Sequence, residues 1–320
     1  MQHQTLPVEN LEGPIAIFGV GGFIGINLLQ KILAVRSDVI GFSHDPEKSW
    51  RLKKASISSR FVTECNLLNR DQVNSVIKKY TPQTIFNLAA YGSYSWDTDS
   101  ERIYQTNLNA TVEIIESLKR KRFTAYIHAG SQSEYGLNAA APAETDATIP
   151  NSHYAVSKLA VRYLLSYFGA MEHLPVVHLR LYSIFAPWKE PRRLMPTLIR
   201  QAIRHKLPAF VAPNISRDYV YIDDCIEALI TVATGMEKKH YGEVFNVASG
   251  KKTTMKELAL IAKKLFNIDK APVFEGMKKR DWDLADWWGN PKKINSEFGW
   301  SAKTTLRQGL IKFYNYETKT

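Results

Sequence analysis

The chain has 320 residues, 45% of them hydrophobic and 23% charged, and no internal repeat, which excludes disordered, collagenous and coiled-coil proteins. At this length roughly 75% of the unfolded chain's surface becomes buried on folding, so a large core needs no disulfides or structural metals. The formal net charge is +11, but the basic residues form short scattered groups, which predicts solvated faces and no nucleic-acid partner.

Up to residue 181, short apolar runs alternate with segments of helical pattern. Strands are expected at residues 15–19, 38–42, 60–63, 84–89, 125–129 and 176–181, with helices at 22–34, 71–80, 104–120 and 154–168. This alternation predicts βαβ units and therefore an α/β fold, with a Rossmann-type doubly wound parallel sheet over residues 1–181.

The pattern changes after residue 181, where prolines, basic residues and aromatic residues accumulate and the expected helices are short. We therefore expect a smaller, irregular C-terminal domain over residues 182–320 that mainly binds the substrate. An apolar run at 243–247 is typical of a buried strand and is expected to return to the Rossmann domain.

The least charged stretch, residues 13–30, raises the question of a membrane segment. Pro14 and several glycines interrupt it, it is slightly short for a span, and residues 1–12 contain no Lys or Arg. We expect neither a signal peptide nor a membrane anchor. The two cysteines, Cys65 and Cys225, lack the CxxC spacing of a metal site, so we expect no metal and a reduced, cytoplasmic protein.

Three glycines stand in GxxGxxG spacing between the first strand and the first helix. In this place such a loop turns tightly, brings backbone N–H groups close to a pyrophosphate and lets the helix pack on the strand. The pattern predicts a dinucleotide site formed by Gly19, Gly22, Phe23, Ile24 and Gly25.

The second strand ends without the acid that usually binds the ribose 2′-hydroxyl of NAD. Ser43 stands at that position, and a serine tolerates the 2′-phosphate of NADP, with Lys48, Arg51 or Lys53 as its partner. Asp45, two residues later, is the alternative partner for the hydroxyl. The cofactor is therefore expected to be NAD or NADP, and the choice between them stays open.

Tyr154 and Lys158 are four residues apart and so share one face of an expected helix. A phenol with a pKa near ~10 is a poor base at neutral pH, and a neighbouring cation lowers that pKa. This predicts Tyr154 as a general acid and base tuned by Lys158. Ser131 follows a strand, at the sheet edge where α/β proteins bind ligands, and its hydroxyl is placed to bridge Tyr154 and a substrate oxygen.

Further motifs follow these residues along the chain. They are Asn87-Leu88-Ala89-Ala90, Asn107, Arg217-Asp218-Tyr219-Val220, Asp223-Asp224, and Asn290-Pro291-Lys292-Lys293 leading to Phe298-Gly299-Trp300. With the glycine loop, Ser131 and Tyr154-x-x-x-Lys158, they resemble the extended short-chain dehydrogenase/reductase superfamily, in its NAD-dependent epimerase/dehydratase branch acting on nucleotide sugars. The resemblance covers nearly the whole chain.

The resemblance implies a redox mechanism. Tyr154 would exchange a proton with a sugar hydroxyl while the neighbouring carbon exchanges a hydride with nicotinamide C4. Ser131 would hydrogen-bond the same oxygen, Lys158 would hold the nicotinamide ribose, and Asn107 would position the active-site helix through backbone contacts. Further implied cofactor contacts are Asn66, Leu67, Ala89 and Ala90, with Asn66 in place of the acid common there.

On the substrate side, the resemblance implies that Arg217 and Arg280 contact the diphosphate of a nucleotide sugar. Guanidinium groups bind phosphates in a strong, geometrically specific way. Trp287 matches a position near the sugar ring, and Ser133 is a further substrate position. Ser183 replaces an asparagine found in many relatives, which suggests that the sugar or base is not that of the commonest UDP-hexose.

Departures from the family pattern bear on the reaction. Dehydratases of the family carry an Asp-Glu pair after the edge hydroxyl residue and decarboxylases a glutamate, whereas this chain has Gln132 and Ser133, with Glu134 one place later. We therefore expect a nucleotide-sugar 4-epimerase that transiently oxidises the sugar C4 hydroxyl to a ketone. The alternatives are an NADPH-dependent 4-keto-6-deoxyhexose reductase and a non-catalytic dinucleotide-binding regulator.

The resemblance also implies a homodimer, built from the helix that carries Asn107 and the helix that carries Tyr154. The apolar side chains spaced along the second helix are Tyr163, Leu164, Tyr167 and Phe168. Their spacing is compatible with such an interface and equally with packing inside the protein.

Overall fold

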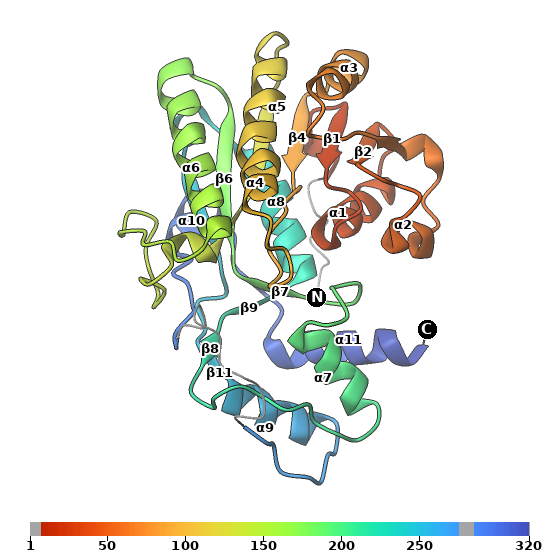
Figure 1. The fold of residues 1–320 in the computed structure, drawn as a ribbon, viewed down its shortest axis with the longest axis vertical. Coiled ribbons are helices and arrows are strands. Elements are labelled where there is room, and N and C mark those ends of the chain that lie inside the picture. Colours follow the sequence, from red (N-terminus) through yellow and green to blue (C-terminus); the bar gives the residue numbers. More distant parts are fainter. Residues whose placement is uncertain (1–7, 275–284, 320) are drawn as a thin grey trace. The chain divides into compact units, whose positions relative to one another are not determined.

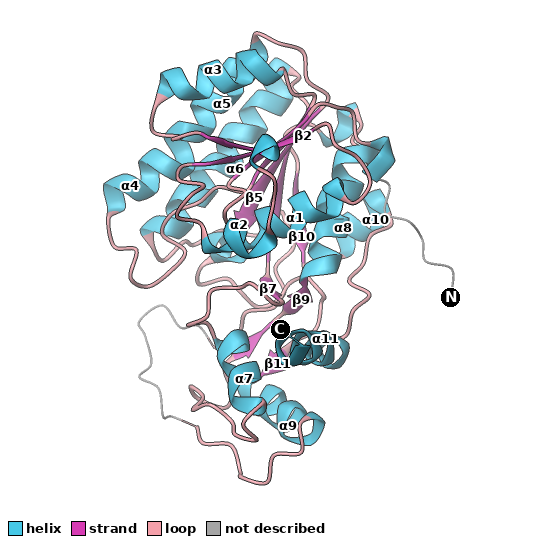
Figure 2. Ribbon diagram, turned by 90° about the vertical axis from the view of Figure 1, so that its right-hand side faces the viewer, coloured by secondary structure: helices cyan, strands magenta, loops and turns pink. Residues whose placement is uncertain are grey.

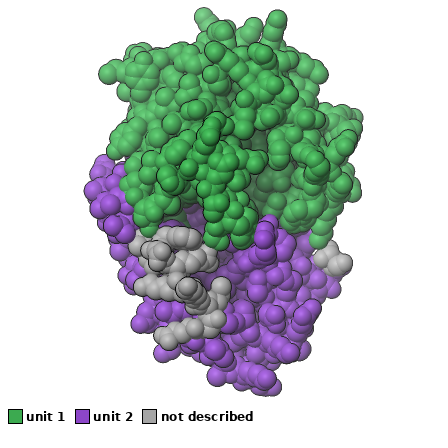
Figure 3. Space-filling view, viewed as in Figure 1, with its two compact units in different colours: residues 1–134, 150–180, 226–245 green, residues 135–149, 181–225, 246–320 purple. Residues whose placement is uncertain are grey.

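The computed structural model describes residues 8–274 and 285–319, which divide into two compact units (Figure 3). Unit 1 contains the described residues up to Glu134 together with Pro150–Arg180 and Ile226–Phe245. Unit 2 contains Tyr135–Ile149, Leu181–Cys225 and the described residues from Asn246 onward. The chain thus passes between the units several times, and each unit is assembled from separated segments.

A seven-stranded sheet is the main structural feature (Figure 1). In chain order its strands are β1 (Ile15–Phe18), β2 (Val39–Ser43), β3 (Val62–Glu64), β4 (Thr84–Asn87), β5 (Ala125–Ser131), β6 (Val176–Leu181) and β10 (Val244–Val247). They lie side by side in the order β10-β6-β5-β4-β1-β2-β3, and the pairs from β3 to β5 are parallel. The predicted Rossmann-type sheet is confirmed, because the order reverses beside β1 as in doubly wound dinucleotide-binding folds.

Helices pack against this sheet, with α3, α5 and α6 together on one face and α1 on the other (Figure 2). The helices that begin in unit 1 are α1 (Phe23–Leu33), α2 (Trp50–Ala55), α3 (Arg70–Tyr80), α4 (Ser100–Tyr104), α5 (Ala110–Lys119) and α6 (His153–Glu172). α8 (Ile222–Gly235) begins in unit 2 and continues into unit 1.

Burial on both faces explains why the strands read as unbroken apolar runs rather than as an alternating pattern. All four residues of β1 are buried, as are all four of β4. On one face the strands share a core with the apolar sides of α3, α5 and α6, where Val73, Ile115 and Leu165 are completely buried. This core fixes the helix that carries Tyr154 against the sheet.

The helix expected at 104–120 differs from the prediction. It begins earlier, at Ser100, because the Asp99 side chain caps it by accepting a hydrogen bond from the backbone N–H of Arg102. It is also interrupted by a π-helical turn at Gln105–Asn109 before α5 continues. Such bulges are frequent at functional sites, and this one contains Asn107.

Unit 2 has two small sheets. β7 (Ser183–Phe185) pairs in parallel with β9 (Tyr219–Tyr221), and β8 (Ser216–Arg217) pairs antiparallel with β11 (Thr253–Thr254). Its further helices are α7 (Leu194–Ala202), α9 (Met255–Leu265), α10 (Lys292–Phe298) and α11 (Leu306–Lys319). Within the described ranges, no helix combines the length and apolar character needed to cross a bilayer.

Candidate active site

The glycine loop fits tightly against the segment that follows β4. Gly19 has a positive φ of 83°, and a Cβ there would lie 2.6 Å from the backbone nitrogen of Ala89. A Cβ on Gly25 would overlap the carbonyl oxygen of Gly19. Both positions therefore require glycine, and the loop brings Gly19, Gly25 and Ala89 together.

The N-terminus of α1 follows the glycine loop directly. Gly22 is its N-cap residue and has no side chain to cap the first turn, which Phe23 and Ile24 begin. The backbone N–H groups of a first helical turn and the helix dipole together favour a phosphate at this end. The loop and helix thus fit the pyrophosphate of a dinucleotide.

Ser43 ends β2 and is buried close to the glycine loop. A Cβ on Gly21 would lie 3.1 Å from the Oγ atoms of both Ser43 and Ser49. Asp45, the alternative ribose ligand, forms a salt bridge with Lys48, whose ammonium lies 2.8 Å from the carboxylate. The hydrogen bond from the Lys48 side chain lowers the pKa of Asp45. Arg51 is buried with its guanidinium 4.5 Å from the centre of the Trp50 ring.

The remaining predicted cofactor residues follow β3 and β4. Asn66 is exposed, and its Oδ1 accepts a hydrogen bond of 3.0 Å from the backbone N–H of Leu68. Leu67 is half-buried against the core shared by α3, α5 and α6. Ala90 is exposed directly after Ala89.

Ser131 ends β5 and is held by three contacts. Its Oγ lies 2.8 Å from the Oγ of Ser133 and accepts a bond of 3.2 Å from the Ser133 backbone N–H. Its own backbone N–H donates to Glu134 Oε1 over 2.7 Å. The structure therefore joins Ser131 and Ser133 in one hydroxyl pair.

Tyr154 and Lys158 lie on consecutive turns at the start of α6. The Ser152 side chain caps this helix by accepting a bond from the Ala155 N–H, and the helix N-terminus favours negative charge on its first turn. The Lys158 ammonium is buried, donates to the carbonyl of Ala129 over 2.8 Å and lies 6.0 Å from the centre of the Tyr154 ring. Burial lowers the pKa of Lys158 to about 8.

Asn107 links the segment after β4 to α6. Its amide is completely buried, makes two bonds of 2.9 Å to the backbone of Tyr91 and donates to Ser157 Oγ over 2.9 Å. The expected backbone contacts are the two to Tyr91, while the link to the active-site helix runs from the Asn107 side chain to the Ser157 hydroxyl. Asn107 thereby fixes the position of Ser157, the residue next to Lys158.

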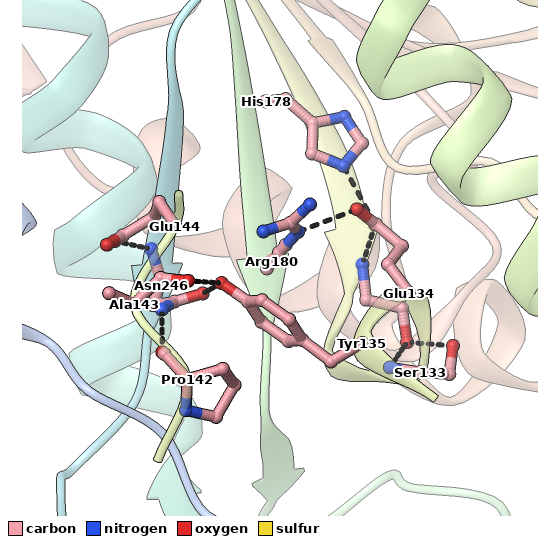
Figure 4. Close-up of polar contacts among 10 residues, drawn as sticks. Ser133, Glu134, Tyr135, Pro142, Ala143, Glu144, His178, Arg180 and Asn246 are labelled. Carbon is pink, nitrogen blue, oxygen red and sulfur yellow. Dashed lines mark hydrogen bonds and ion pairs between the residues drawn. The ribbon is translucent and has the colours of Figure 1, made fainter. Parts of the chain in front are cut away.

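A buried charged cluster behind Ser131 was not predicted. Glu134 accepts bonds of 2.8 Å from His178 Nε2 and from Arg180 Nε, and all three side chains are buried (Figure 4). Burial alone would raise the pKa of Glu134, but His178 and Arg180 together lower it to about 2. Burial also lowers the pKa of His178, so at neutral pH its neutral ring donates to Glu134 while Arg180 carries the positive charge.

Unit 2 contains the other predicted substrate residues. The Arg217 guanidinium lies 5.0 Å from the centre of the Trp287 ring and donates to the Ser216 carbonyl over 2.7 Å. The backbone N–H of Ser183 donates to the carbonyl of Asp218 over 2.9 Å. The structure thus brings Arg217 and Trp287 together, while Arg280 lies outside the described residues.

Two buried residues organise unit 2 without having been predicted. The Asp218 carboxylate accepts bonds from the backbone N–H groups of Ser249, Gly250 and Gly289. The Tyr135 hydroxyl donates over 2.9 Å to the side chain of a buried asparagine, as Figure 4 also shows. The sequence signal for Asp218 was its place in the Arg-Asp-Tyr-Val motif, beside Arg217.

Comparison with known proteins identifies the class. The model of the NAD dependent epimerase/dehydratase family matches residues 15–248, and the chain belongs to this family. Protein CapI of Staphylococcus aureus is 24% identical over 94% of this chain and 97% of its own length. UDP-glucuronate 4-epimerase 1 of Arabidopsis thaliana is 25% identical over 95% of this chain and 78% of its own length.

Solved structures give the same fold. The UDP-glucuronic acid 4-epimerase of Bacillus cereus, in complex with UDP-glucuronic acid and NAD, superimposes with a TM-score of 0.82 at 25% identity, covering 95% of this chain and 99% of that one. The UDP-glucose 4-epimerase of Thermotoga maritima, with UDP-glucose, gives a TM-score of 0.84 at 23% identity, covering 95% and 98%.

The fit of the glycine loop predicts the effect of a single methyl group. Gly19→Ala is expected to weaken NAD or NADP binding at least about tenfold, because the new Cβ meets the Ala89 backbone and the positive φ adds about 1–2 kcal/mol of strain. Isothermal titration calorimetry measures the affinity. Gly299→Ala is the matched control, because Gly299 also has a positive φ (65°) but open space around its Cβ position. Equal weakening in both variants would contradict the assignment.

Proposed function

We propose that the protein is an NAD(P)-dependent nucleotide-sugar 4-epimerase. The observation that carries this proposal is the position of Glu134, the one carboxylate in the loop after Ser131. Its side chain is completely buried and bonded to His178 and Arg180, so it does not serve as the acid or base of water loss or decarboxylation. The residues that remain for the reaction are Ser131, Tyr154 and Lys158, which are the set that redox chemistry requires.

In the proposed reaction the chain's own residues handle the proton. Tyr154 accepts it from the sugar C4 hydroxyl while the hydride leaves C4, and returns it when the hydride comes back to the other face of the ketone. Ser131 hydrogen-bonds the same oxygen, and the Lys158 cation stabilises the Tyr154 phenolate. The bound nicotinamide supplies reversible hydride acceptance, so the cofactor is regenerated in each cycle.

A second candidate is a 4-keto-sugar reductase that consumes NADPH. Ser43 favours it, because a buried serine at the end of β2 leaves room for a 2′-phosphate that an acid would repel. The Ser131, Tyr154 and Lys158 set serves either reaction. The two reactions differ in cofactor use, since an epimerase regenerates its cofactor in each cycle and a reductase oxidises NADPH and releases it.

The first experiment identifies the dinucleotide released on denaturing freshly purified protein and then assays UDP-hexoses and UDP-hexuronates. Near-stoichiometric NAD with epimer formation and no net NADH supports the epimerase.

Tyr154→Phe is expected to lower turnover by about 100-fold or more while dinucleotide affinity is unchanged, since proton transfer contributes 10²–10⁴-fold. An empty protein that oxidises NADPH with 4-keto-6-deoxy sugars replaces the proposal with the reductase, and unchanged turnover in Tyr154→Phe contradicts both.

We further propose that Arg217 binds the diphosphate of the substrate. Arg217→Ala is expected to raise the Kd for a UDP-sugar by roughly 10- to 100-fold, because a charge-assisted contact is worth about 1.5–3 kcal/mol. Titration with UDP alone isolates this contact from the sugar. Arg307→Ala, an exposed arginine on α11 of the same unit, is the control. If both variants bind UDP as the wild type does, Arg217 is not a diphosphate ligand.

The proposed functional form is a homodimer through α6 and the helix that carries Asn107. Tyr163, Tyr167 and Met171 are 57%, 53% and 71% exposed on this helix, an unusual apolar exposure for one stretch. Phe168, predicted with Tyr163 and Tyr167 from the sequence, lies in the core, and Leu164 is half-buried against that core.

We also propose a cytoplasmic location, which the buried free thiols of Cys65 and Cys225 support.

The dimer has its own test. Tyr167→Glu is expected to convert a dimer into a monomer, because it places a charge in the middle of an apolar contact. Sedimentation velocity measures the change. Leu260→Glu, at a residue 47% exposed on α9, is the control and leaves the dimer intact. A wild-type protein that sediments as a monomer would contradict the proposal directly.

A further inference from the structure

Arg217 in unit 2 is held by an aromatic ring as well as by a hydrogen bond. Its guanidinium lies over the Trp287 ring, 5.0 Å from the ring centre, and donates to the Ser216 carbonyl over 2.7 Å. The first distance is within the range of a cation–π contact. Guanidinium groups combine such contacts with their planar set of N–H donors, so the ring orders Arg217 in a way that is compatible with binding a phosphate.

Trp287 is held in turn by the completely buried Ser216. The Ser216 Oγ donates to Asp286 Oδ1 over 2.9 Å and accepts the Trp287 backbone N–H over 3.3 Å. The Ser216 backbone N–H donates to the carbonyl of Ala285 over 2.7 Å. Three hydrogen bonds thus join this segment to β8, at the residue before Arg217.

Asp286 also connects the Trp287 segment to β11, the strand that pairs with β8. The Lys252 ammonium, directly before β11, lies 2.6 Å from Asp286 Oδ1. Hydrogen bonds from Lys252 and Ser216 lower the pKa of Asp286, so the carboxylate is ionised at neutral pH. β8 is therefore tied to β11 and to the segment that carries Trp287, and Asp286 contacts both.

This arrangement has a consequence for binding at Arg217. An arginine side chain has several rotatable bonds, and fixing them in one conformation costs conformational entropy. Where the protein orders the side chain before the ligand arrives, this cost does not reduce the affinity. A contact that orders Arg217 in the free protein therefore strengthens binding even when it never touches the ligand.

We propose that Trp287 is a positioning residue, which orders the Arg217 guanidinium for the diphosphate of a nucleotide sugar, and that Asp286 keeps Trp287 in place. This inference deepens the proposed function and rests on it for the role of Arg217. It gives Trp287 an effect on phosphate binding that acts through Arg217, in place of the position near the sugar ring that the resemblance implies.

The first test measures the Kd for UDP by isothermal titration calorimetry, because UDP has the diphosphate but no sugar. Trp287→Leu removes the aromatic face and is expected to raise the Kd roughly 5- to 10-fold, whereas Trp287→Phe keeps such a face and raises it about twofold or less. Trp50→Leu is the control, because the Arg51 guanidinium lies 4.5 Å from that ring in unit 1. Wild-type affinity in Trp287→Leu, or equal weakening in the two Trp287 variants, overturns the positioning role.

The same substitution in an Arg217→Ala background separates positioning from direct contact. If Trp287 acts through Arg217, Trp287→Leu has no further effect on the Kd once Arg217 is alanine, so the two changes are not additive. A Trp287 that touches UDP itself, or that only supports the fold of unit 2, weakens binding by the same factor in both backgrounds, and this result overturns the proposal. Circular dichroism and thermal unfolding verify that each variant is folded.

Asp286→Ala tests the link between the carboxylate and Trp287. It removes the acceptor for Ser216 and Lys252, and the Kd for UDP is expected to rise by roughly 3- to 10-fold, because the ring is released from Arg217. Dinucleotide affinity should be unchanged. Asp223→Ala is the matched control and binds UDP as the wild type does, because Asp223 also pairs with a lysine of unit 2, at 3.2 Å. Equal affinity in Asp286→Ala and the wild type overturns the role of Asp286.

Failure of this inference differs from failure of the proposed function. A wild-type protein that does not bind UDP, or an Arg217→Ala variant that binds it as tightly as the wild type, overturns the diphosphate site and this inference with it. Weakened binding in Arg217→Ala together with wild-type affinity in Trp287→Leu overturns this inference alone.

Discussion

The parallel register of the central strands is the constraint on which the candidate site depends. Phe18, Asn87 and His128 lie at one level across β1, β4 and β5, so the residues that follow them leave the sheet along one edge. Gly19 and Ala89 meet there, and β5 continues to Ser131. The glycine loop and the loop that begins at Ser131 are thus neighbours because the strands end together at the edge where open α/β sheets generally bind ligands.

The same architecture limits where charge can be placed. With helices on both faces, a polar group below the edge of the sheet has no access to water and must find its partners inside the protein. Lys158 and Glu134 are both in this position: Lys158 donates to the carbonyl of Ala129, and Glu134 accepts from Ser131, His178 and Arg180. In the proposed mechanism Lys158 acts on Tyr154, which touches the substrate together with Ser131, and Glu134 accepts the backbone N–H of Ser131.

The sequence predicted the parts of the site that are local in the chain. Each of these patterns lies within a few consecutive residues: the glycine spacing, the position of Ser131 after a strand, and the four-residue spacing of Tyr154 and Lys158. Partners set by strand pairing were not predicted, because His178 and Arg180 stand in a segment that reads simply as an apolar strand. The acidic Glu134 in the Ser131 loop was the signal available, and its partners follow only from the fold.

The position of Glu134 also bears on the reaction that we propose for the site. A carboxylate one or two residues earlier in the loop would belong to dehydration or decarboxylation in this family, according to the resemblance noted in the sequence. At position 134 the side chain is completely buried, where His178 and Arg180 hold its pKa low and keep it ionised. A shift of one residue along the loop therefore separates a carboxylate placed for acid and base chemistry from one that accepts the Ser131 N–H, and this difference is the reason for proposing redox chemistry at C4.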